Sequence, residues 1–168
     1  IEARNSLSQI FVNSILEESI LKVLPSVMEK VDELRLSSSG PKALQVLIRN
    51  AFLNFGFASR LSNAGDNNNW AELAVDNDEN LFAVEIENST DGLDSARRVI
   101  SDLAIACGRY GVPLNDLVPV IIMARLPNIR TDYYSVVQDA NMRLGIKILT
   151  VPVALIIWSI YIEDFDLI

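Results

Sequence analysis

The stretch LFAVEIE at residues 81–87 decides the fold that we predict for this chain. Four apolar residues lead into two glutamates, Glu85 and Glu87, which stand two positions apart. Side chains two positions apart on a β-strand point to the same face of a sheet, and Ile86 between them points to the other face. The stretch therefore predicts a buried strand with two carboxylates side by side near its end.

An earlier strand-like run, Trp70–Asp76, is joined to this stretch by NDEN at residues 77–80, a composition typical of a turn. The two runs and the turn predict a β-hairpin. Asp76 ends the first run nine residues before Glu85. We expect the hairpin to bring Asp76 back toward the second strand, so that three carboxylates converge.

Acidic residues concentrate around this hairpin. Eight of the 22 acidic residues lie between Glu72 and Asp94. Repulsion between neighbouring carboxylates raises their pKa values unless a cation neutralises them. Oxygen ligands without nitrogen or sulfur suit Mg²⁺, Ca²⁺ or Mn²⁺, and Mg²⁺ held by carboxylates and a phosphate serves phosphodiester hydrolysis. The alternative is that these residues form only the solvated face of a hairpin.

The periodicity of apolar residues predicts an α/β fold, with a five-stranded mixed sheet and helices on both of its faces. Residues 6–35 have a helical pattern, which Pro25 divides into two helices. The later elements are expected at Pro41–Asn54 (helix), Phe55–Ser59 (strand), Trp70–Asp76 and Leu81–Glu87 (hairpin), Leu93–Cys107 (helix), Leu117–Ala124 (strand), Tyr133–Leu144 (helix) and Val151–Tyr161 (strand). We expect one domain over residues 1–168, with N-terminal helices at 1–40 and a core at 41–161.

Composition excludes several classes of protein. The 168 residues include one cysteine, Cys107, and no histidine, which rules out an internal disulfide, a cysteine zinc site and Ser-His-Asp catalysis. The net charge of −8 argues against a broadly basic nucleic-acid binder, so any DNA contact requires a local basic face. The longest apolar runs are well short of the roughly 20 residues of a membrane span. No signal-peptide pattern is visible, and we expect a cytoplasmic protein without membrane contact.

The ordered motifs resemble those of the PD-(D/E)xK nuclease superfamily, and more closely those of the type II restriction endonucleases of the BglII, BstYI and BamHI group. The likeness rests on Asp76 and EIE at residues 85–87, then on SARR at residues 95–98 and the pair Tyr133-Tyr134. It covers about residues 41–161 in order and type. The third motif position, usually lysine in the superfamily, is Glu87 here.

This resemblance implies a restriction-endonuclease-like core and a magnesium-dependent endonuclease that hydrolyses phosphodiester bonds in double-stranded DNA. It implies that Asp76 and Glu85 bind Mg²⁺, and that Glu87 binds the metal or assists the attacking water. Glu72 competes with Asp76 as the first metal ligand, because ELAV at residues 72–75 also fits the superfamily pattern of an acid before a short apolar strand. The alternatives are a catalytically inactive nuclease-fold module that binds DNA or another protein, and a repair or junction nuclease of the same superfamily.

Basic residues near the acidic pair are candidate DNA contacts. Arg97 and Arg98 begin the helix that follows the acids, where they are placed to contact phosphates. The alternative interpretation pairs these arginines with Asp94 and Asp102 on the helix surface.

Two further arginines, Arg125 and Arg130, flank the loop after a core strand, where the resemblance places DNA contacts. The alternative is that they are ordinary solvated loop residues. Lys147 lies on the approach to the last strand and is a candidate electrostatic substitute for the missing motif lysine.

We also expect a homodimer, because one set of acids cuts one strand and a two-fold pair cuts a duplex symmetrically. The resemblance points to the helices Leu93–Cys107 and Tyr133–Leu144 as the interface. Their apolar patterns predict exposed positions at Val99, Ile105 and Val136. The alternative is that these side chains cover the sheet more broadly or are singly exposed.

Overall fold

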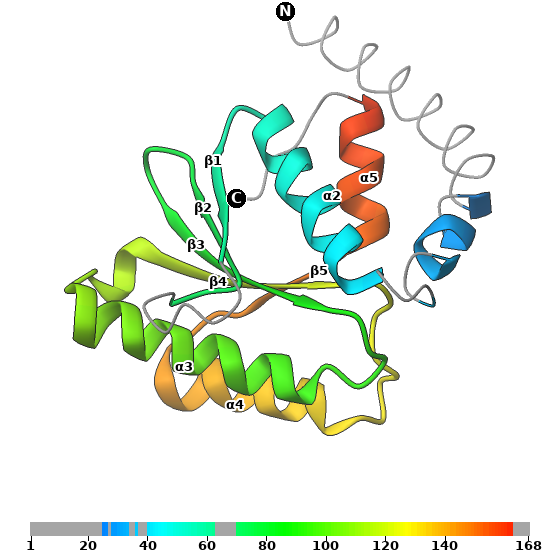
Figure 1. Cartoon of the computed structure of the whole chain (residues 1–168). Helices are drawn as coiled ribbons and strands as arrows, with labels where there is room; N and C mark the ends of the chain where they lie inside the picture. Colours follow the sequence, from blue (N-terminus) through cyan, green and yellow to red (C-terminus); the bar gives the residue numbers. More distant parts are fainter. Residues whose placement is uncertain (1–24, 27, 34–35, 37–39, 63–69, 163–168) are drawn as a thin grey trace, which may run out of the picture.

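The computed structural model describes residues 25–26, 28–33, 36, 40–62 and 70–162 of the chain (Figure 1). The helix predicted before residue 25 lies outside these ranges, whereas residues 28–33 are helical as predicted. The elements follow in chain order as α2 (Gly40–Asn54), β1 (Ala58–Leu61), β2 (Leu73–Asp76), β3 (Leu81–Glu87), α3 (Leu93–Tyr110), the 3₁₀ turn η1 (Leu114–Asp116), β4 (Leu117–Met123), α4 (Asp132–Leu144), β5 (Leu149–Pro152) and α5 (Val153–Ile162).

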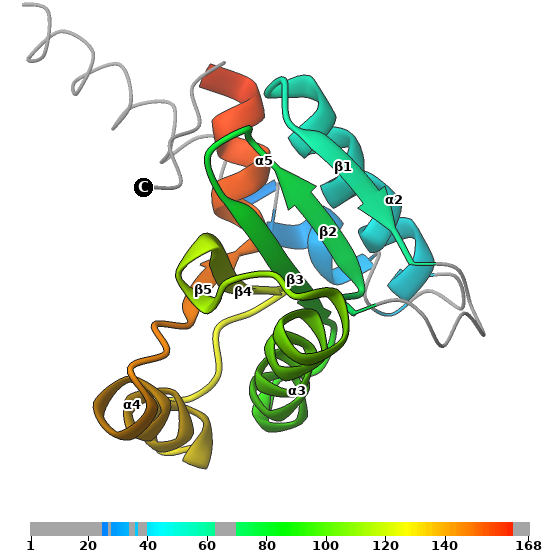
Figure 2. The ribbon, with the colours of Figure 1, turned by 90° about the vertical axis from the view of Figure 1, so that its left-hand side faces the viewer.

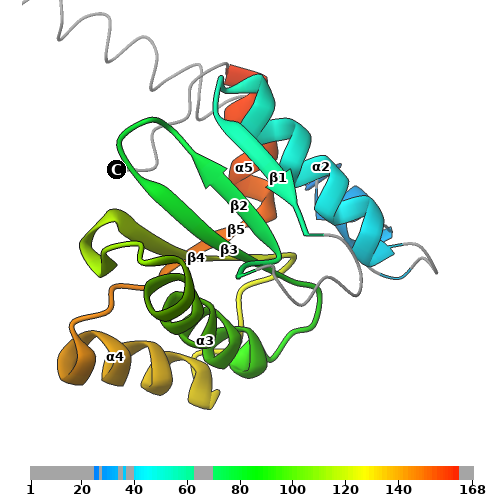
Figure 3. The ribbon, with the colours of Figure 1, turned by 60° about the vertical axis from the view of Figure 1, so that its left-hand side comes forward.

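The predicted five-stranded mixed sheet is confirmed, with its strands in the spatial order β1-β2-β3-β4-β5. Strands β1, β2 and β3 pair antiparallel (Figure 3), whereas β3, β4 and β5 pair parallel. A parallel pair requires a crossover, and α3 supplies the crossover between β3 and β4. Helices α3 and α4 cover one face of the sheet, and α2 and α5 cover the other (Figure 1, Figure 2).

Strand β3 is buried almost throughout, because helices lie on both sides of the sheet. Phe82 and Val84 belong to the apolar cluster beneath α2 and α5. Ala83 belongs to the cluster beneath α3 and α4. Glu85 and Glu87 share the face of Ala83, as the strand period of two predicts, and both are buried. The central strand therefore ends with two buried carboxyl groups that face α3.

The last predicted strand, Val151–Tyr161, is wrong over most of its length. Strand β5 ends at Pro152, and α5 follows immediately. The sequence VALIIWSIYI does not alternate, and ten positions that are apolar except for Ser159 fit a buried helix better than a strand of ordinary length. Proline has no N–H for a further ladder bond, and it is common at the start of a helix. Helix α5 packs against α2 (Figure 1).

The first strand of the sheet also begins later than predicted, at Ala58 rather than at Phe55. Phe55 and Gly56 form the turn that ends α2. Gly56 has a φ of 85°, a left-handed conformation that glycine adopts without strain.

Candidate active site

Glu85 is the buried acid at the centre of the candidate site. Its exposed fraction is 4 %, and the Nε atom of Arg98 on α3 lies 3.3 Å from its Oε2 atom. This oxygen is buried and accepts no aligned hydrogen bond. Burial, together with the neighbouring Glu72 carboxylate, raises the pKa of Glu85 to about 8, although Arg98 opposes the shift. The Glu85 carboxyl therefore favours its protonated form at neutral pH.

Glu72 lies beside Glu85 on the neighbouring chain segment. The pairing of β2 with β3 ends with Leu73 opposite Val84. Continued by one residue, the same register places Glu72 opposite Glu85. Both Glu72 oxygens have donors within the protein. Oε2 accepts a hydrogen bond from Ile86 N at 2.8 Å, and Oε1 accepts one from Gln45 Nε2. Because the Glu72 side chain takes the Ile86 N–H, the ladder ends there and β2 begins at Leu73, not at Trp70 as predicted.

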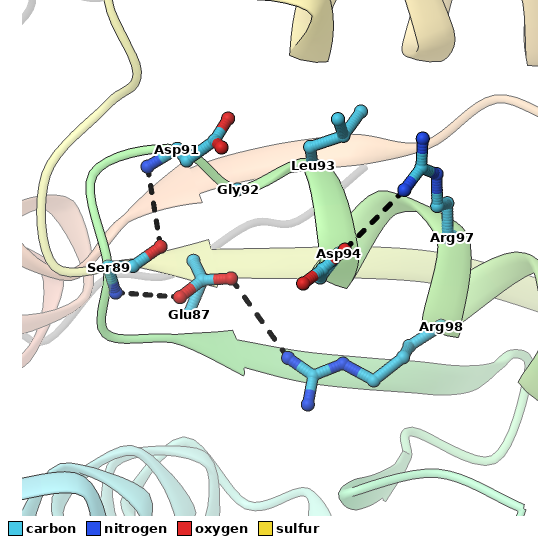
Figure 4. A pocket seen from close by; sticks show the side chains of 8 residues that line it. All are labelled: Glu87, Ser89, Asp91, Gly92, Leu93, Asp94, Arg97 and Arg98. Atoms are coloured by element: carbon cyan, nitrogen blue, oxygen red, sulfur yellow. Dashed lines mark hydrogen bonds and ion pairs between the residues drawn. The ribbon is translucent and has the colours of Figure 1, made fainter.

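Glu87 is surrounded by hydrogen-bond donors (Figure 4). Ser95 Oγ donates to its Oε2 atom at 2.6 Å, and Ser89 N donates to its Oε1 atom at 2.6 Å. Arg98 Nη2 lies 4.0 Å from Oε2. Burial opposes ionisation, but the hydrogen bonds from Ser95 and Ser89 outweigh it and lower the pKa of Glu87. Glu87 is therefore ionised at neutral pH, whereas Glu85 favours the proton.

Three residues on one edge of α3 face these glutamates. Ser95, Arg98 and Asp102 stand three and four positions apart, which places them on one side of a helix. The neighbouring Asp102 carboxyl raises the pKa of Glu85, and burial raises the pKa of Asp102. The buried Oδ2 atom of Asp102 accepts no hydrogen bond. Asp102 belongs to the site, whereas the sequence pattern predicts only that it pairs with an arginine on the helix surface. The sequence signal for its role is its spacing of seven residues from Ser95, which places both residues on the same side of α3.

A pocket of about 650 Å³ opens beside Glu87, at the carboxyl end of β3 (Figure 4). Its lining comes from the loop after β3 and from the start of α3, and consists of Glu87, Ser89, Asp91, Gly92, Leu93, Asp94, Arg97 and Arg98. Gly92 has a φ of 72°, and a Cβ atom there would lie 2.2 Å from Met123 Cε of β4. Glycine permits both this conformation and this close approach. Gly92 thus fixes the start of α3 against the end of β4.

The structure does not bring Asp76 to the other acids, which corrects the predicted convergence. Asp76 pairs with Leu81 at the turn end of the hairpin, whereas Glu85 lies four residues further along β3. The Oδ1 atom of Asp76 accepts a hydrogen bond from Asp78 N at 2.8 Å and so supports the turn. In an antiparallel pair, residues close to the turn on one strand face residues close to the turn on the other. Glu72, rather than Asp76, is therefore the acid beside Glu85.

The two arginines at the start of α3 have different partners. Arg97 forms the predicted surface pair with Asp94, at 3.6 Å. Arg98 instead faces the sheet, and Nη2 donates a hydrogen bond to Ser95 Oγ at 3.0 Å. Arg98 therefore belongs to the acidic site, whereas Arg97 lies at the rim of the pocket.

Arg125 and Arg130 lie on the loop after β4, at the sheet edge that holds the acidic pair. Arg125 is paired with Asp32, and its Nε atom donates to Oδ1 at 2.9 Å. Arg130 is exposed, and its backbone N–H donates to Asn128 Oδ1 at 3.0 Å. Lys147 lines a cleft of about 720 Å³ at the opposite, amino end of β4 and β5. It is therefore not placed to substitute for the motif lysine.

The two helices that we expected to form a dimer interface, α3 and α4, expose residues other than those predicted. Val99 is fully buried in the core beneath α3, so its predicted exposure is wrong, and Ile105 and Val136 are half-buried. The reason is that α3 covers the sheet with a broad stripe that includes Val99. On α4 the exposed apolar side chains include Tyr134 and Met142.

Comparison with models of known protein families, with curated proteins and with solved structures finds no match for this chain. Among the residues that the structure describes, no three or more His, Cys, Asp or Glu side chains are grouped so that they could hold a metal ion. Within the same ranges, no helix is long and apolar enough to span a membrane. Glu85 and Asp102 keep buried oxygens that accept no hydrogen bond, and these atoms retain bonding capacity toward a further group.

Proposed function

We propose that this chain is a magnesium-dependent endonuclease that hydrolyses phosphodiester bonds in double-stranded DNA, as type II restriction enzymes do. One observation carries the proposal. At the end of the central strand, Glu85 lies with Glu72 and Asp102 beside it, and Glu85 and Asp102 hold buried oxygens without a hydrogen bond. An ionised carboxylate at this depth needs a positively charged partner. The Arg98 guanidinium stands in that place, 3.3 Å from Glu85 Oε2, and hard oxygen ligands also suit Mg²⁺.

Mg²⁺ would bind in a site that the substrate completes, since the described residues offer no group of three or more acidic ligands. Mg²⁺ is usually bound through one or two carboxylates together with substrate phosphates and water. Glu85 and Asp102 would hold the ion, and Glu72 would add negative charge beside Glu85. When bound, Mg²⁺ would supply charge stabilisation at the scissile phosphate and lower the pKa of a water molecule.

Glu87 would act on the attacking water rather than on the ion. Its lowered pKa keeps the carboxylate ionised, and the hydrogen bonds from Ser95 and Ser89 hold its orientation. A fixed, ionised carboxylate accepts a hydrogen bond from water and positions it for attack.

Duplex DNA would approach the edge formed by the carboxyl ends of β3 and β4. Ligands of open α/β sheets bind in the crevice at this edge. The loops and helix starts that follow the two strands carry four exposed arginines, Arg97, Arg98, Arg125 and Arg130. With a net charge of −8, the chain would bind DNA through this local group of positive charges.

A non-catalytic nuclease-fold module that binds DNA or a protein is the second candidate. It is favoured by the donors that already occupy the oxygens of Glu72 and Glu87. A carboxylate whose oxygens all have protein donors can be purely structural.

Cleavage of supercoiled plasmid DNA by the full chain separates the two candidates. We expect nicked and linear products with Mg²⁺, no products with EDTA, and a rate at least about 100-fold lower for Glu85→Gln, because a direct ligand is lost. Glu79→Gln makes the same substitution in the exposed hairpin turn and should cleave like the wild type. A wild-type chain that leaves DNA intact in both Mg²⁺ and Mn²⁺ would favour the binding module. Discrete fragments indicate sequence specificity, whereas cleavage confined to branched substrates would favour a repair or junction nuclease.

We also propose that the enzyme is a homodimer that pairs through α4. Tyr134, Gln138 and Met142 are spaced by four residues, so they form one stripe on the helix, and Met142 is 73 % exposed. In an antiparallel two-fold pair, Tyr134 would lie against the partner's Met142. Asp132 at the start of α4 would then lie near the partner's Arg143, so that the charges are complementary as well.

A further inference from the structure

We propose that Arg98 and a divalent cation compete for the same position at Glu85, so that cation binding displaces the Arg98 guanidinium and frees it to contact a DNA phosphate. This inference rests on the nuclease function proposed above. It adds a regulatory device to that site, namely an internal cation that the incoming metal must replace.

The contacts of Arg98 place its guanidinium against both acids of β3. Its Nε atom lies 3.3 Å from Glu85 Oε2, and its Nη2 atom lies 4.0 Å from Glu87 Oε2. A magnesium ion bound to a carboxylate oxygen lies at about 2.1 Å from it. An ion at that distance from Glu85 Oε2 would lie within about 5.4 Å of Arg98 Nε, where the two positive charges repel each other. Arg98 and the cation therefore compete at this oxygen.

Arg98 can leave this position with the loss of one hydrogen bond, from its Nη2 atom to Ser95 Oγ. Its side chain is 57 % exposed, whereas the Glu85 side chain is buried. Glu85 Oε2 accepts no aligned hydrogen bond from it, so the contact is an ion pair without the bidentate geometry of a strong one. The guanidinium already has much of its surface in water, so it needs little further solvation to leave the contact. The acid is thus fixed on the strand while the arginine is replaceable.

The pocket beside the acids offers the displaced side chain a second position. Arg98 already lines this pocket, with Arg97 one residue before it. A guanidinium matches the geometry of a phosphate through two parallel hydrogen bonds. Displacement by the cation would therefore couple metal loading to phosphate binding.

Calorimetric titration of the full chain with Mn²⁺, without DNA, tests the competition. We expect Arg98→Met to bind Mn²⁺ about tenfold more tightly than the wild type, because the competing charge is gone. Arg98→Lys retains a cation and should bind like the wild type. Arg97→Met is the matched control, since it removes the same charge one residue earlier, where the partner is Asp94 on the surface. Equal or weaker Mn²⁺ binding by Arg98→Met, or no Mn²⁺ binding by either protein, would overturn the inference.

Cleavage assays on the same proteins keep this inference apart from the proposed function. We expect Arg98→Met to cleave at least about tenfold more slowly despite its tighter Mn²⁺ binding, because a phosphate contact is lost. Tighter binding by Arg98→Met with no cleavage by the wild type would leave the competition in place and overturn the nuclease proposal. Cleavage by the wild type, together with equal Mn²⁺ affinities of the wild type and Arg98→Met, would support the nuclease proposal and overturn the competition. Circular dichroism checks the fold of each variant, and Arg98→Gln replaces Arg98→Met if the latter does not fold.

Discussion

Glu85 binds a proton more tightly in the folded chain than in the unfolded chain, since its folded pKa is about 8 against an ordinary value of 4.5. A raised folded pKa stabilises the protein at low pH, and this contribution is lost as the pH rises through the folded value. In EDTA, we expect the free energy of unfolding to fall by roughly 3 kcal/mol between pH 5 and pH 8. The raised pKa of Asp102 acts in the same direction, whereas the lowered pKa of Glu87 acts only at more acidic pH.

Urea unfolding of the wild type and of Glu85→Gln at several pH values between 5 and 8 measures this contribution. Glutamine carries no titratable proton, so the variant should lose most of the pH dependence and should be the more stable protein at pH 8. If the free energy of unfolding changes equally with pH in the two proteins, Glu85 is not the group that binds the stabilising proton.

Gly92 is the residue whose replacement should damage the site through the backbone. Gly92→Ala places a Cβ atom at a φ of 72° and 2.2 Å from Met123 Cε, with the ring of Tyr133 at 3.1 Å. We expect a loss of roughly 1–3 kcal/mol in the free energy of unfolding, because the conformation is strained and the buried Met123 must move. Gly108→Ala on the same helix meets no atom within 4 Å and should stabilise the chain by about 0.5–1 kcal/mol. Urea unfolding compares the two variants. A free energy of unfolding of Gly92→Ala equal to that of the wild type would contradict the role of Gly92 in fixing the start of α3.

Among the elements, the β2–β3 hairpin decides which acid accompanies Glu85. The register places Glu72 beside Glu85, with Asp76 at the turn. We therefore expect Glu72→Gln to lower the rate of plasmid cleavage at least about tenfold, through loss of charge at the metal site. Asp76→Asn should cleave like the wild type, because asparagine can also accept the Asp78 N–H and support the turn. A larger effect of Asp76→Asn than of Glu72→Gln would contradict the assignment drawn from the register.

The sequence predicts the hairpin and the shared face of Glu85 and Glu87, because both follow from the period of two. It does not predict the register. That depends on the turn, in which Asp78 adopts a φ of 69°, and on the Glu72 side chain that ends the ladder. The sequence does not predict the start of α5 either, because a long apolar run is compatible with a buried strand and with a buried helix.

Helix α4 carries the prediction about assembly. Met142→Asp should shift the chain from dimer to monomer, because it buries a charge between the two helices. Leu53→Asp makes the same kind of change at an exposed apolar residue of α2, on the other face of the sheet, and should leave the dimer intact. Sedimentation equilibrium distinguishes the states, with the wild type at twice 18.6 kDa. A wild-type mass of one chain at micromolar concentration would rule out this interface.

For the whole molecule, one edge of the sheet gathers the acids, the pocket and the exposed arginines. The order of elements predicts this edge, because the carboxyl ends of β3 and β4 meet there once α3 makes the crossover. The role of Asp102 and the partners of Arg98 could not be predicted in the same way. They depend on how α3 is rotated and seated against β3, which is set by packing over Val99 and Leu103 rather than by a local pattern.

Anomalous scattering from a crystal of the full chain soaked in Mn²⁺ tests most directly whether this edge is a metal-dependent active site. We expect an anomalous peak at coordination distance, about 2.0–2.2 Å, from Glu85, with Asp102 as a second ligand and the Arg98 guanidinium moved into the pocket. Glu85→Gln, soaked in the same way, should show no peak at this position. A wild-type crystal in which Arg98 still lies against Glu85, with no manganese at that carboxylate, would contradict the proposed site.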